Sequence, residues 1–313
     1  MKSATRIILI IVAVLVVVGG IVGYGVYNEQ VRPFRHVVIE IDDVEVSMGY
    51  FLKRLAMTNT EPLVMLTILV KEELVLLRGP QPPYNIKISD QDIESFLREQ
   101  ARGTAESIPD AVYREWFRQQ LNDSGLNARE FPDLMRRTLM AQDLGNYLGR
   151  TADTVLPHVL LHAIQTADAE TAEEALARLR AGNSFELVAT ALNEPTGLRR
   201  SGGEWGWFAR ASLPDEIGFA VFEELGLGEF DGPFQLDDGQ FVVVRLTNRV
   251  EARQVADDAL SAVRAAAVDN WINTEIEFHN VDFHGFTNGY DAETDAWVRW
   301  QLQRLQRENS TQG

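Results

Sequence analysis

The sequence predicts an α+β protein that follows an N-terminal transmembrane helix. Three observations support this prediction: residues 7–27 carry no charge, residues 36–150 repeat apolar side chains at helical spacing, and residues 155–250 alternate strand-like and helix-like segments. A helical segment, residues 251–313, ends the chain. With 313 residues, the chain is long enough for two or more folded units.

The composition excludes several classes of function. The chain has 46 Asp and Glu against 29 Lys and Arg, a formal net charge of -17. This charge repels phosphate backbones, so nucleic acid is not an expected partner. The chain contains no cysteine, which excludes disulfides, thiolate nucleophiles, thiolate metal sites and cysteine-linked lipid anchors.

Residues 7–27 read IILIIVAVLVVVGGIVGYGVY, a run of 21 uncharged residues. As a helix with a rise of about 1.5 Å per residue, this run matches a hydrocarbon core of about 30 Å. The short segment 1–6 carries Lys2 and Arg6, which predicts a cytoplasmic tail and an extracytoplasmic location for the bulk of the chain. The alternative is a cleaved signal peptide, but such peptides have shorter apolar stretches and a small-residue cleavage site, which is not found here. We therefore expect a single-pass anchor in the cell membrane, with the lipid bilayer as a partner of residues 7–27.

After a polar linker, residues 28–35, the first folded module begins with an expected strand or hairpin. Between Val37 and Val46, isoleucine and valine alternate with other residues about an Asp42-Asp43 turn. The next residue, a serine, is a favoured N-cap for the helix that follows.

Further helices are expected in this module from their start and stop signals. One runs from Pro62 to Leu77, because proline suits the first helical turn and a Gly-Pro pair follows the last one. Its expected core-facing residues are Leu63, Leu66, Val70 and Leu74. The later helices start at a Ser89–Asp92 capping box, near Ala111 and at an Asn127–Glu130 pair. The last of them carries an apolar stripe made of Phe131, Leu134, Met135, Leu139 and Leu144.

In the second module, an apolar run from Val155 to Ile164 predicts a strand. Thr171 with Glu174 predicts the start of a helix, and a serine at position 184 predicts the start of another. The final strand, which begins at Phe241, is apolar at nearly every position, as expected for a strand covered on both faces. These segments predict a small mixed sheet flanked by helices.

Helical character returns after Arg249 and again near the end of the chain. Trp297 and Trp300 are three residues apart in the final helical stretch, so they can share one helix face. The pattern does not decide whether the segment 251–313 packs on the module 36–150 or forms its own unit.

A series of landmarks between residues 155 and 250 resembles the parvulin peptidyl-prolyl isomerase domain. In chain order the landmarks are the strand with His162, the helix 171–180, Gly182-Asn183-Ser184-Phe185, Gly202-Gly203-Glu204-Trp205-Gly206-Trp207-Phe208, Ala220-Val221-Phe222, Gly228-Glu229 and Gly239-Gln240-Phe241-Val242-Val243. The order of anchor, helical module, parvulin-like domain and helical tail is similar to exported foldases and chaperones of the SurA and PrsA type. That resemblance implies that the helices on both sides of the domain form one chaperone body.

The resemblance implies a peptidyl-prolyl cis-trans isomerase (EC 5.2.1.8). Rotation about an X-Pro amide meets a barrier of about 18–20 kcal/mol because the planar form has partial double-bond character. No bond is broken, so the reaction needs no nucleophile, metal or cofactor. The catalyst needs only to bind the twisted amide more tightly than the planar one. The expected partners are unfolded or nascent exported polypeptides that contain X-Pro bonds.

The resemblance also implies a set of site residues. His162 matches the family's first active-site histidine, with a one-residue difference in length before the next helix. Leu213 and Ile217 stand where the family has a methionine and a phenylalanine that line the proline pocket. The expected catalytic residues are His162 and Asn193, and the expected substrate-binding residues are Leu213, Ile217, Phe208, Trp207 and Phe241.

Two departures from the family pattern leave the catalytic activity open. The family's second histidine corresponds to Phe241, and its Tyr-Ser-x-Asp sequence corresponds to Leu192-Asn193-Glu194-Pro195, which secures no carboxylate at the matching position. The first hypothesis is an isomerase and chaperone for exported proteins. The alternatives are a holdase chaperone with weak or no isomerase activity, and a structural scaffold with no affinity for unfolded chains.

Other chemistry lacks support in the sequence. His158 and His162 are four residues apart, but they lie in an expected strand, where the spacing is too long for two ligands of one metal ion. The sequence contains no nucleotide-binding phosphate loop and no hydrolase motif of the Gly-x-Ser-x-Gly or His-Glu-x-x-His kind.

Overall fold

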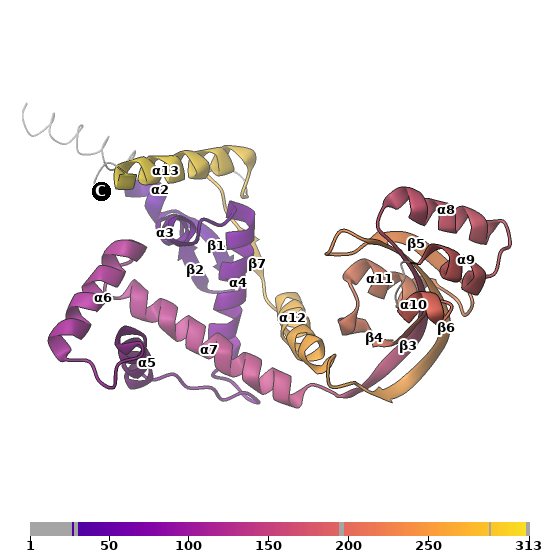
Figure 1. Cartoon of the computed structure of the whole chain (residues 1–313). Helices are drawn as coiled ribbons and strands as arrows, with labels where there is room; N and C mark the ends of the chain where they lie inside the picture. Colours follow the sequence, from indigo (N-terminus) through magenta and orange to yellow (C-terminus); the bar gives the residue numbers. More distant parts are fainter. Residues whose placement is uncertain (1–26, 28–30, 194–196, 288, 311–313) are drawn as a thin grey trace, which may run out of the picture. The chain divides into compact units, whose positions relative to one another are not determined.

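The computed structural model describes residues 27, 31–193, 197–287 and 289–310 (Figure 1). The chain forms two compact units. Unit 1 takes the chain up to Leu144 and again from Trp271, and unit 2 is Gly145–Asn270. The expected anchor, residues 7–27, lies outside the described residues except for its last one, Tyr27. Among the residues that are described, no helix has the length and apolar character needed to cross a bilayer.

Unit 1 contains a three-stranded antiparallel sheet with the strand order β2-β1-β7. Its strands are β1 (Val37–Ile41), β2 (Val44–Ser47) and β7 (Val281–Phe283). The hairpin between β1 and β2 turns at Asp42-Asp43, as the sequence predicts, and Asp42 adopts a positive φ of 51° there. Because β7 pairs with β1, a strand near the C-terminus completes a sheet that begins near the N-terminus.

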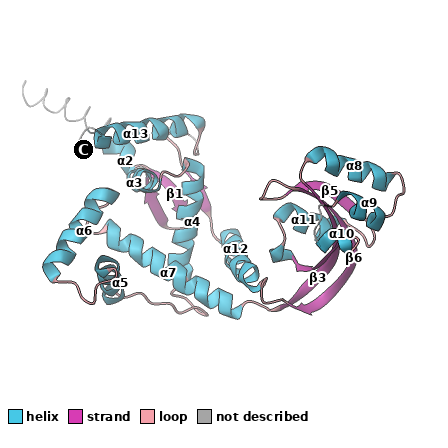
Figure 2. Ribbon diagram, in the orientation of Figure 1, coloured by secondary structure: helices cyan, strands magenta, loops and turns pink. Residues whose placement is uncertain are grey.

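Helices make up most of unit 1 (Figure 2). They are α2 (Arg32–Arg35), α3 (Met48–Thr58), α4 (Pro62–Arg78), α5 (Asp90–Arg102), α6 (Asp110–Ser124), α7 (Glu130–Thr151), α12 (Leu260–Phe278) and α13 (Ala292–Ser310), of which α7 and α12 each continue from one unit into the other. The predicted caps are present. The Ser47 side chain accepts a hydrogen bond from the backbone N–H of Tyr50, and Ser89 and Asp92 form the capping box. Local sequence signals therefore set where these helices start.

The main core of unit 1 lies between β1, α3, α4 and α13. Leu66, Val70 and Leu74 of α4 are buried there, as predicted. Leu63 was expected on the same face, but it is 63% exposed. Leu63 belongs to the first turn of α4, in which Pro62 is buried and Leu63 is not, so helical spacing alone misplaced it. A smaller core joins α5, α6 and α7, whose stripe residues Phe131 and Leu134 are buried in it.

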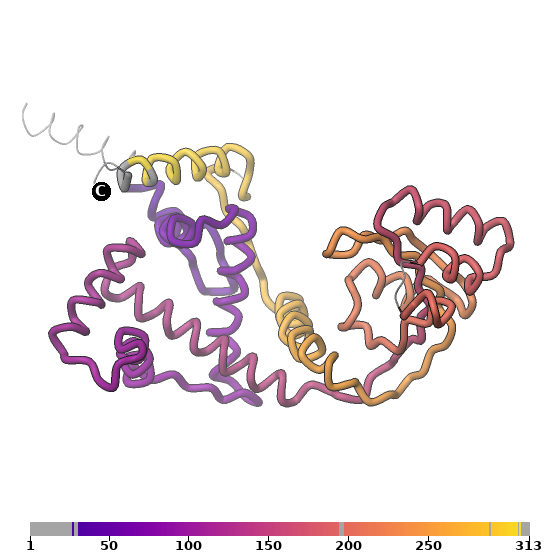
Figure 3. The backbone as a smooth tube through the Cα atoms, viewed as in Figure 1, coloured from indigo at the N-terminus to yellow at the C-terminus, as the bar shows by residue number. Residues whose placement is uncertain are grey.

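The C-terminal part of the chain returns to the N-terminal helices (Figure 3). Val298 of α13 is fully buried in the main core, and the ring of Trp297 packs edge-on against Phe34 of α2. Trp271 donates a hydrogen bond from its indole Nε1–H to the hydroxyl of Tyr84 at 2.7 Å. The chain from Trp271 onward therefore shares a folded body with the helices before Leu144.

Unit 2 is built on a four-stranded sheet with the order β4-β3-β6-β5. Its strands are β3 (Val155–Thr166), β4 (Glu204–Ala209), β5 (Phe230–Gln235) and β6 (Phe241–Gln254). Every neighbouring pair is antiparallel, so the predicted mixed sheet is wrong. The connection between β5 and β6 gives one physical reason. Only residues 236–240 join these two strands, and so short a connection allows antiparallel pairing alone. β6 also continues past Arg249, where helix was expected, because it pairs with β3 as far as Gln254.

Helices cover both faces of this sheet (Figure 2). The helical segments of unit 2 are α8 (Ala169–Arg180), α9 (Phe185–Leu192), α10 (Gly197–Arg200), the 3-10 turn η2 (Arg210–Ser212), α11 (Asp215–Phe219) and the π-helical turn η3 (Ala220–Glu224). α8 and α9 pack on one face, and α11 with η3 packs on the other. The N-cap of α8 is Asp168, whose side chain accepts from the backbone N–H of Thr171, so the helix starts before the expected Thr171.

Candidate functional site

The candidate site residues lie on both faces of the unit 2 sheet. Side chains alternate between faces along a strand. On β3, Leu161 and Ala163 belong to the core beneath α11, whereas Ile164 belongs to the core beneath α8 and α9. His162, between Leu161 and Ala163, therefore points to the α9 side.

The surroundings of His162 agree with this placement. Its ring packs edge-on against Phe185 of α9, and its Nδ1 is 2.8 Å from the hydroxyl of Thr247. Burial lowers the pKa of His162, and the nearby positive charge of Arg245 lowers this pKa further. The imidazole is therefore held neutral near pH 7 and is hydrogen-bonded within the α9 side of the sheet.

Asn193, at the C-cap of α9, is buried, with only 2% of its surface exposed. Its side-chain Oδ1 accepts from the backbone N–H of Gln165 at 2.6 Å, and its Nδ2 donates to the backbone carbonyl of Ala163 at 3.1 Å. The last residue of β3 that pairs with β4 is His162, and both hydrogen bonds of Asn193 go to β3 residues after it. The amide of Asn193 thus continues the sheet's hydrogen bonding in place of a strand.

Leu213 and Ile217 meet in the core beneath α11. Ile217 is completely buried, and Leu213 is nearly so. They pack with Val159, Leu161 and Val242 of the sheet and with half-buried rings that include Phe208. The two aliphatic side chains at the family's pocket positions therefore form one apolar surface.

A cleft of about 700 Å³ borders this surface. Ile217, Phe241, Pro233, Phe234 and Leu236 give it apolar walls, and its polar lining comes from Asp215, Glu216, Gln235 and Asp237, with Pro214 and Gly239 completing it. The residues come from α11, from β5 and its turn, and from the start of β6. Such a cleft can accept an apolar ring while the acidic groups at its edge stay in water.

A second cleft in unit 2, of about 570 Å³, is lined by aromatic residues. Trp205, Trp207 and Phe208 of β4 line it together with His158. The guanidinium of Arg253 lies 4.8 Å from the centre of the Trp207 ring, close enough for a cation–π interaction. Trp207 and Phe208, which were both expected to bind substrate, therefore line a different cleft from Ile217 and Phe241.

The predicted catalytic residues line neither of these clefts in the described part of the chain. Ala163, the residue after His162 on β3, lies in the core that contains Leu213 and Ile217.

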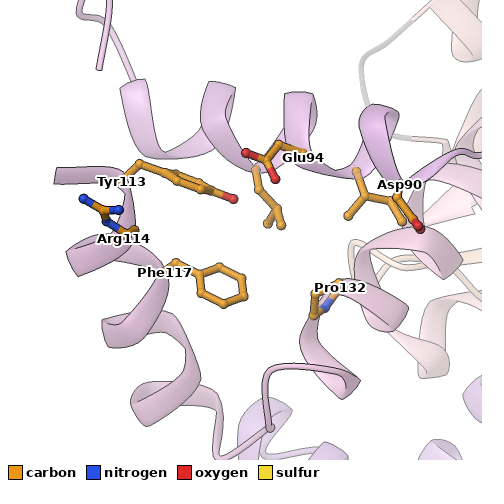
Figure 4. A pocket seen from close by; sticks show the side chains of 8 residues that line it. Asp90, Glu94, Tyr113, Arg114, Phe117 and Pro132 are labelled. Atoms are coloured by element: carbon orange, nitrogen blue, oxygen red, sulfur yellow. The ribbon is translucent and has the colours of Figure 1, made fainter. Parts of the chain in front are cut away.

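Sequence reasoning did not single out a further cavity, which lies in unit 1 between α5, α6 and α7 (Figure 4). The cavity is about 350 Å³ in volume and is lined by Asp90, Ile93, Glu94, Leu97, Tyr113, Arg114, Phe117 and Pro132. Its two carboxylates are compensated, because Arg136 pairs with Asp90 at 2.6 Å and Arg98 pairs with Glu94 at 2.8 Å. Ile93 and Leu97, four residues apart in α5, both line the cavity and are buried. Their apolar spacing is the sequence feature from which this side of the cavity could have been predicted.

The described residues contain no group of three or more His, Asp or Glu side chains placed to hold a metal ion. His279 pairs with Asp42 at 2.6 Å and His284 with Glu40 at 3.0 Å, so these imidazoles tie the C-terminal segment to the β1–β2 hairpin and to β1.

Comparison with known proteins gives the family of unit 2. Residues 150–262 match the model of the PPIC-type PPIase domain. The foldase protein PrsA of Bacillus subtilis is 23% identical over 243 residues, which cover 76% of this chain and 76% of that protein. PrsA of Geobacillus kaustophilus is 25% identical over 168 residues, 52% of this chain and 56% of that protein. The crystal structure of the peptidylprolyl isomerase PrsA from Bacillus cereus matches with 16% identity and a TM-score of 0.34, over 87% of this chain and 92% of its own. Residues 150–262 of the chain therefore form a parvulin domain of the PPIC type, and the PrsA foldases are homologues of the chain.

Proposed function

We propose that the chain is an extracytoplasmic foldase, anchored in the cell membrane by residues 7–27, that isomerises X-Pro bonds in exported proteins and holds those proteins while they fold. The uncharged run of 21 residues supports the anchor, and the family of unit 2 supports the reaction. The observation that carries the proposal is the cleft between α11 and the turn before β6, whose apolar lining includes Phe241, Pro233 and Phe234.

The cleft suits the reaction because prolyl isomerisation needs a receptor for a ring and no reactive group. A proline ring placed against Phe241, Pro233 and Phe234 would leave water, and the X-Pro amide would lie at the cleft mouth. Rotation of that amide proceeds fastest if the twisted form is held more tightly than the planar one. Leu213 supports the floor of the pocket from the core, and Trp207 and Phe208 would hold a neighbouring part of the client.

His162 and Asn193 would then act from within the sheet. The neutral imidazole of His162 and the amide of Asn193 fix the positions of β6, α9 and the edge of β3. Exported polypeptides that are unfolded or still emerging from the membrane are the proposed clients. The cavity between α5, α6 and α7 would accept an apolar client side chain, which gives unit 1 a holding role.

A second candidate function is a holdase with little or no isomerase activity, and specific features favour it. Phe241 stands where the family has its second histidine, and both polar ends of the Asn193 side chain are engaged by β3. The groups that would stabilise the redistributed charge of the twisted amide are then missing, while the cleft with Phe241, Pro233 and Phe234 in its wall remains.

A protease-coupled proline-peptide assay on the full chain in detergent tests the isomerase. The informative variant is Phe241→Ala, which removes a wall of the cleft, and the matched control is Phe219→Ala, an exposed ring on α11 that does not line it. We expect acceleration above the uncatalysed rate for the wild type and the control, and a loss of several-fold in the Phe241 variant. Equal rates in both variants would remove the cleft from the mechanism.

Suppression of aggregation of a reduced, unfolded client separates the two candidates. A wild-type chain that suppresses aggregation without accelerating isomerisation is a holdase. Phe117→Ala, which opens the unit 1 cavity, should weaken suppression and leave any prolyl isomerisation unchanged. If neither activity is present, both candidates fail and a scaffold role remains.

A further inference from the structure

The surface formed by α2 and α13 carries a charge opposite to that of the rest of the chain. Together α2 and α13 contain five arginines against three acidic residues, Glu293, Asp295 and Glu308, whereas the whole chain has 46 acidic residues against 29 basic ones. Arg299 is paired with Glu61 and Asp295. All five arginines are exposed: Arg32, Arg35, Arg299, Arg304 and Arg307. Far apart in sequence, the two segments meet where Phe34 of α2 packs against Trp297 of α13, with ring centroids 5.6 Å apart.

An exposed tryptophan lies within this basic surface. The α13 residues Val298 and Gln301 are buried, and the opposite face presents Trp300, which is 54% exposed. Arg304 and Arg307 follow Trp300 at positions i+4 and i+7, so the three side chains share one helix face. The Arg304 guanidinium lies 5.6 Å from the centre of the Trp300 ring. A large ring with an N–H group, flanked by arginines, is typical of side chains that lie at a membrane's headgroup level.

The covalent path places this surface near the proposed anchor. Arg32, the first residue of α2, follows Tyr27, the last residue of the apolar run, by five positions along the chain. A fully extended chain covers at most about 3.6 Å per residue, so α2 starts within about 18 Å of the end of the anchor. α2 packs on α13, so α13 is tethered to the same region.

We propose that the α2–α13 surface, made of Arg32, Arg35, Trp300, Arg304 and Arg307, docks unit 1 onto anionic phospholipid headgroups of the membrane that holds the chain. The arginines bind lipid phosphates, and Trp300 enters the headgroup region. This inference rests on the proposed anchor for its geometry. Docking fixes which side of unit 1 faces the bilayer, and thus leaves the opposite side open to clients.

The full chain, reconstituted into vesicles, tests docking directly. Because the sequence has no cysteine, one engineered cysteine carries one environment-sensitive dye. The reporter is Gln303→Cys on the exposed face of α13, and the control is Gln119→Cys on the exposed side of α6. We expect the dye at 303 to shift to the blue in vesicles that contain phosphatidylglycerol and not in pure phosphatidylcholine. The dye at 119 should not respond to either lipid.

Removing arginines from the α2–α13 surface tests how much their charge contributes to docking. Each arginine near an anionic surface contributes about 1 kcal/mol, so Arg304→Gln with Arg307→Gln should lower the docking constant about thirtyfold. The matched control, Arg118→Gln with Arg129→Gln, removes the same charge from other exposed positions of unit 1 and should leave docking unchanged. Raising the salt concentration to 1 M should also release the wild-type surface, because the Debye length falls to about 3 Å.

Vesicle flotation separates failure of docking from failure of the anchor. Flotation with both lipid mixtures, but with no dye response at 303, would overturn the docking surface and leave the anchor standing. A response at 303 with flotation only on anionic vesicles would support docking and overturn the anchor. Flotation with neither mixture, or equal dye responses at 303 and 119, would overturn the docking proposal.

Discussion

Replacing Asn193 with alanine should loosen the edge of β3. The buried amide of Asn193 satisfies the backbone N–H of Gln165 at 2.6 Å and the carbonyl of Ala163 at 3.1 Å. Alanine leaves both backbone groups without these partners, and an unsatisfied buried polar group costs about 1–3 kcal/mol. Because the edge of a sheet relaxes more easily than its centre, we expect the free energy of unfolding of unit 2 to fall by about 2–4 kcal/mol.

Asn183→Ala is the matched control. Asn183 also donates through its side-chain amide to a backbone carbonyl, that of Arg178 at 2.8 Å, but in an exposed position where water can replace it. The control should cost less than about 1 kcal/mol. Urea unfolding followed by circular dichroism measures both variants. Hydrogen–deuterium exchange at Gln165 reports the lost bond directly and should accelerate only in the Asn193 variant.

The catalytic interpretation of Asn193 predicts another pattern. If the amide acted on the substrate, Asn193→Ala would lower the isomerisation rate while unfolding and the exchange of the Gln165 amide stayed at wild-type values. That result would refute the structural role argued from the two hydrogen bonds.

Three further predictions concern the same unit. Ile217→Ala should cost about 2–5 kcal/mol, because Ile217 is completely buried, and an unchanged urea midpoint would contradict its place in the core. The pKa of His162 is lowered by burial and by Arg245, so the unfolded state takes up the proton first and unit 2 should lose stability as the pH falls through about 6.5 and below; in His162→Gln this part of the pH dependence should vanish, and an unchanged slope would assign it to another group. Gly203→Ala should destabilise by about 1–3 kcal/mol, because Gly203 has a φ of +95° and an added Cβ would lie 3.0 Å from the carbonyl oxygen of Ala163; wild-type thermal stability would show that the turn adapts.

Much of the local structure follows from short-range chemistry. Ser47 and Ser89 cap helices where a hydroxyl can accept from the first free N–H groups, and Pro62 begins α4 because its ring suits the first turn. The order of landmarks that resembles parvulins was also readable from the chain, and residues 150–262 match that family. These features depend on a few neighbouring residues, so no tertiary information is needed to predict them.

Predictions about shared faces were less secure. Leu63 has the helical spacing of its buried neighbours, yet it is exposed while Pro62 in the same turn of α4 is buried. Trp207 and Phe208 are adjacent to the pocket residues in the family pattern, but they line a cleft separate from the one that contains Ile217. Which elements cover a given side chain depends on packing between segments that are distant in the chain. The local sequence pattern carries no information about that packing.

His162 shows the limit most clearly. The sequence alone determined that a histidine stands in the first strand of the domain, that an apolar pair lies four residues apart after the glycine-rich turn, and that an uncharged run precedes the folded body. Only the tertiary structure decided that His162 faces α9 while Ala163 faces Leu213 and Ile217. The physical reason is the two-residue period of a strand, in which a register difference of one residue moves a side chain from one face of the sheet to the other.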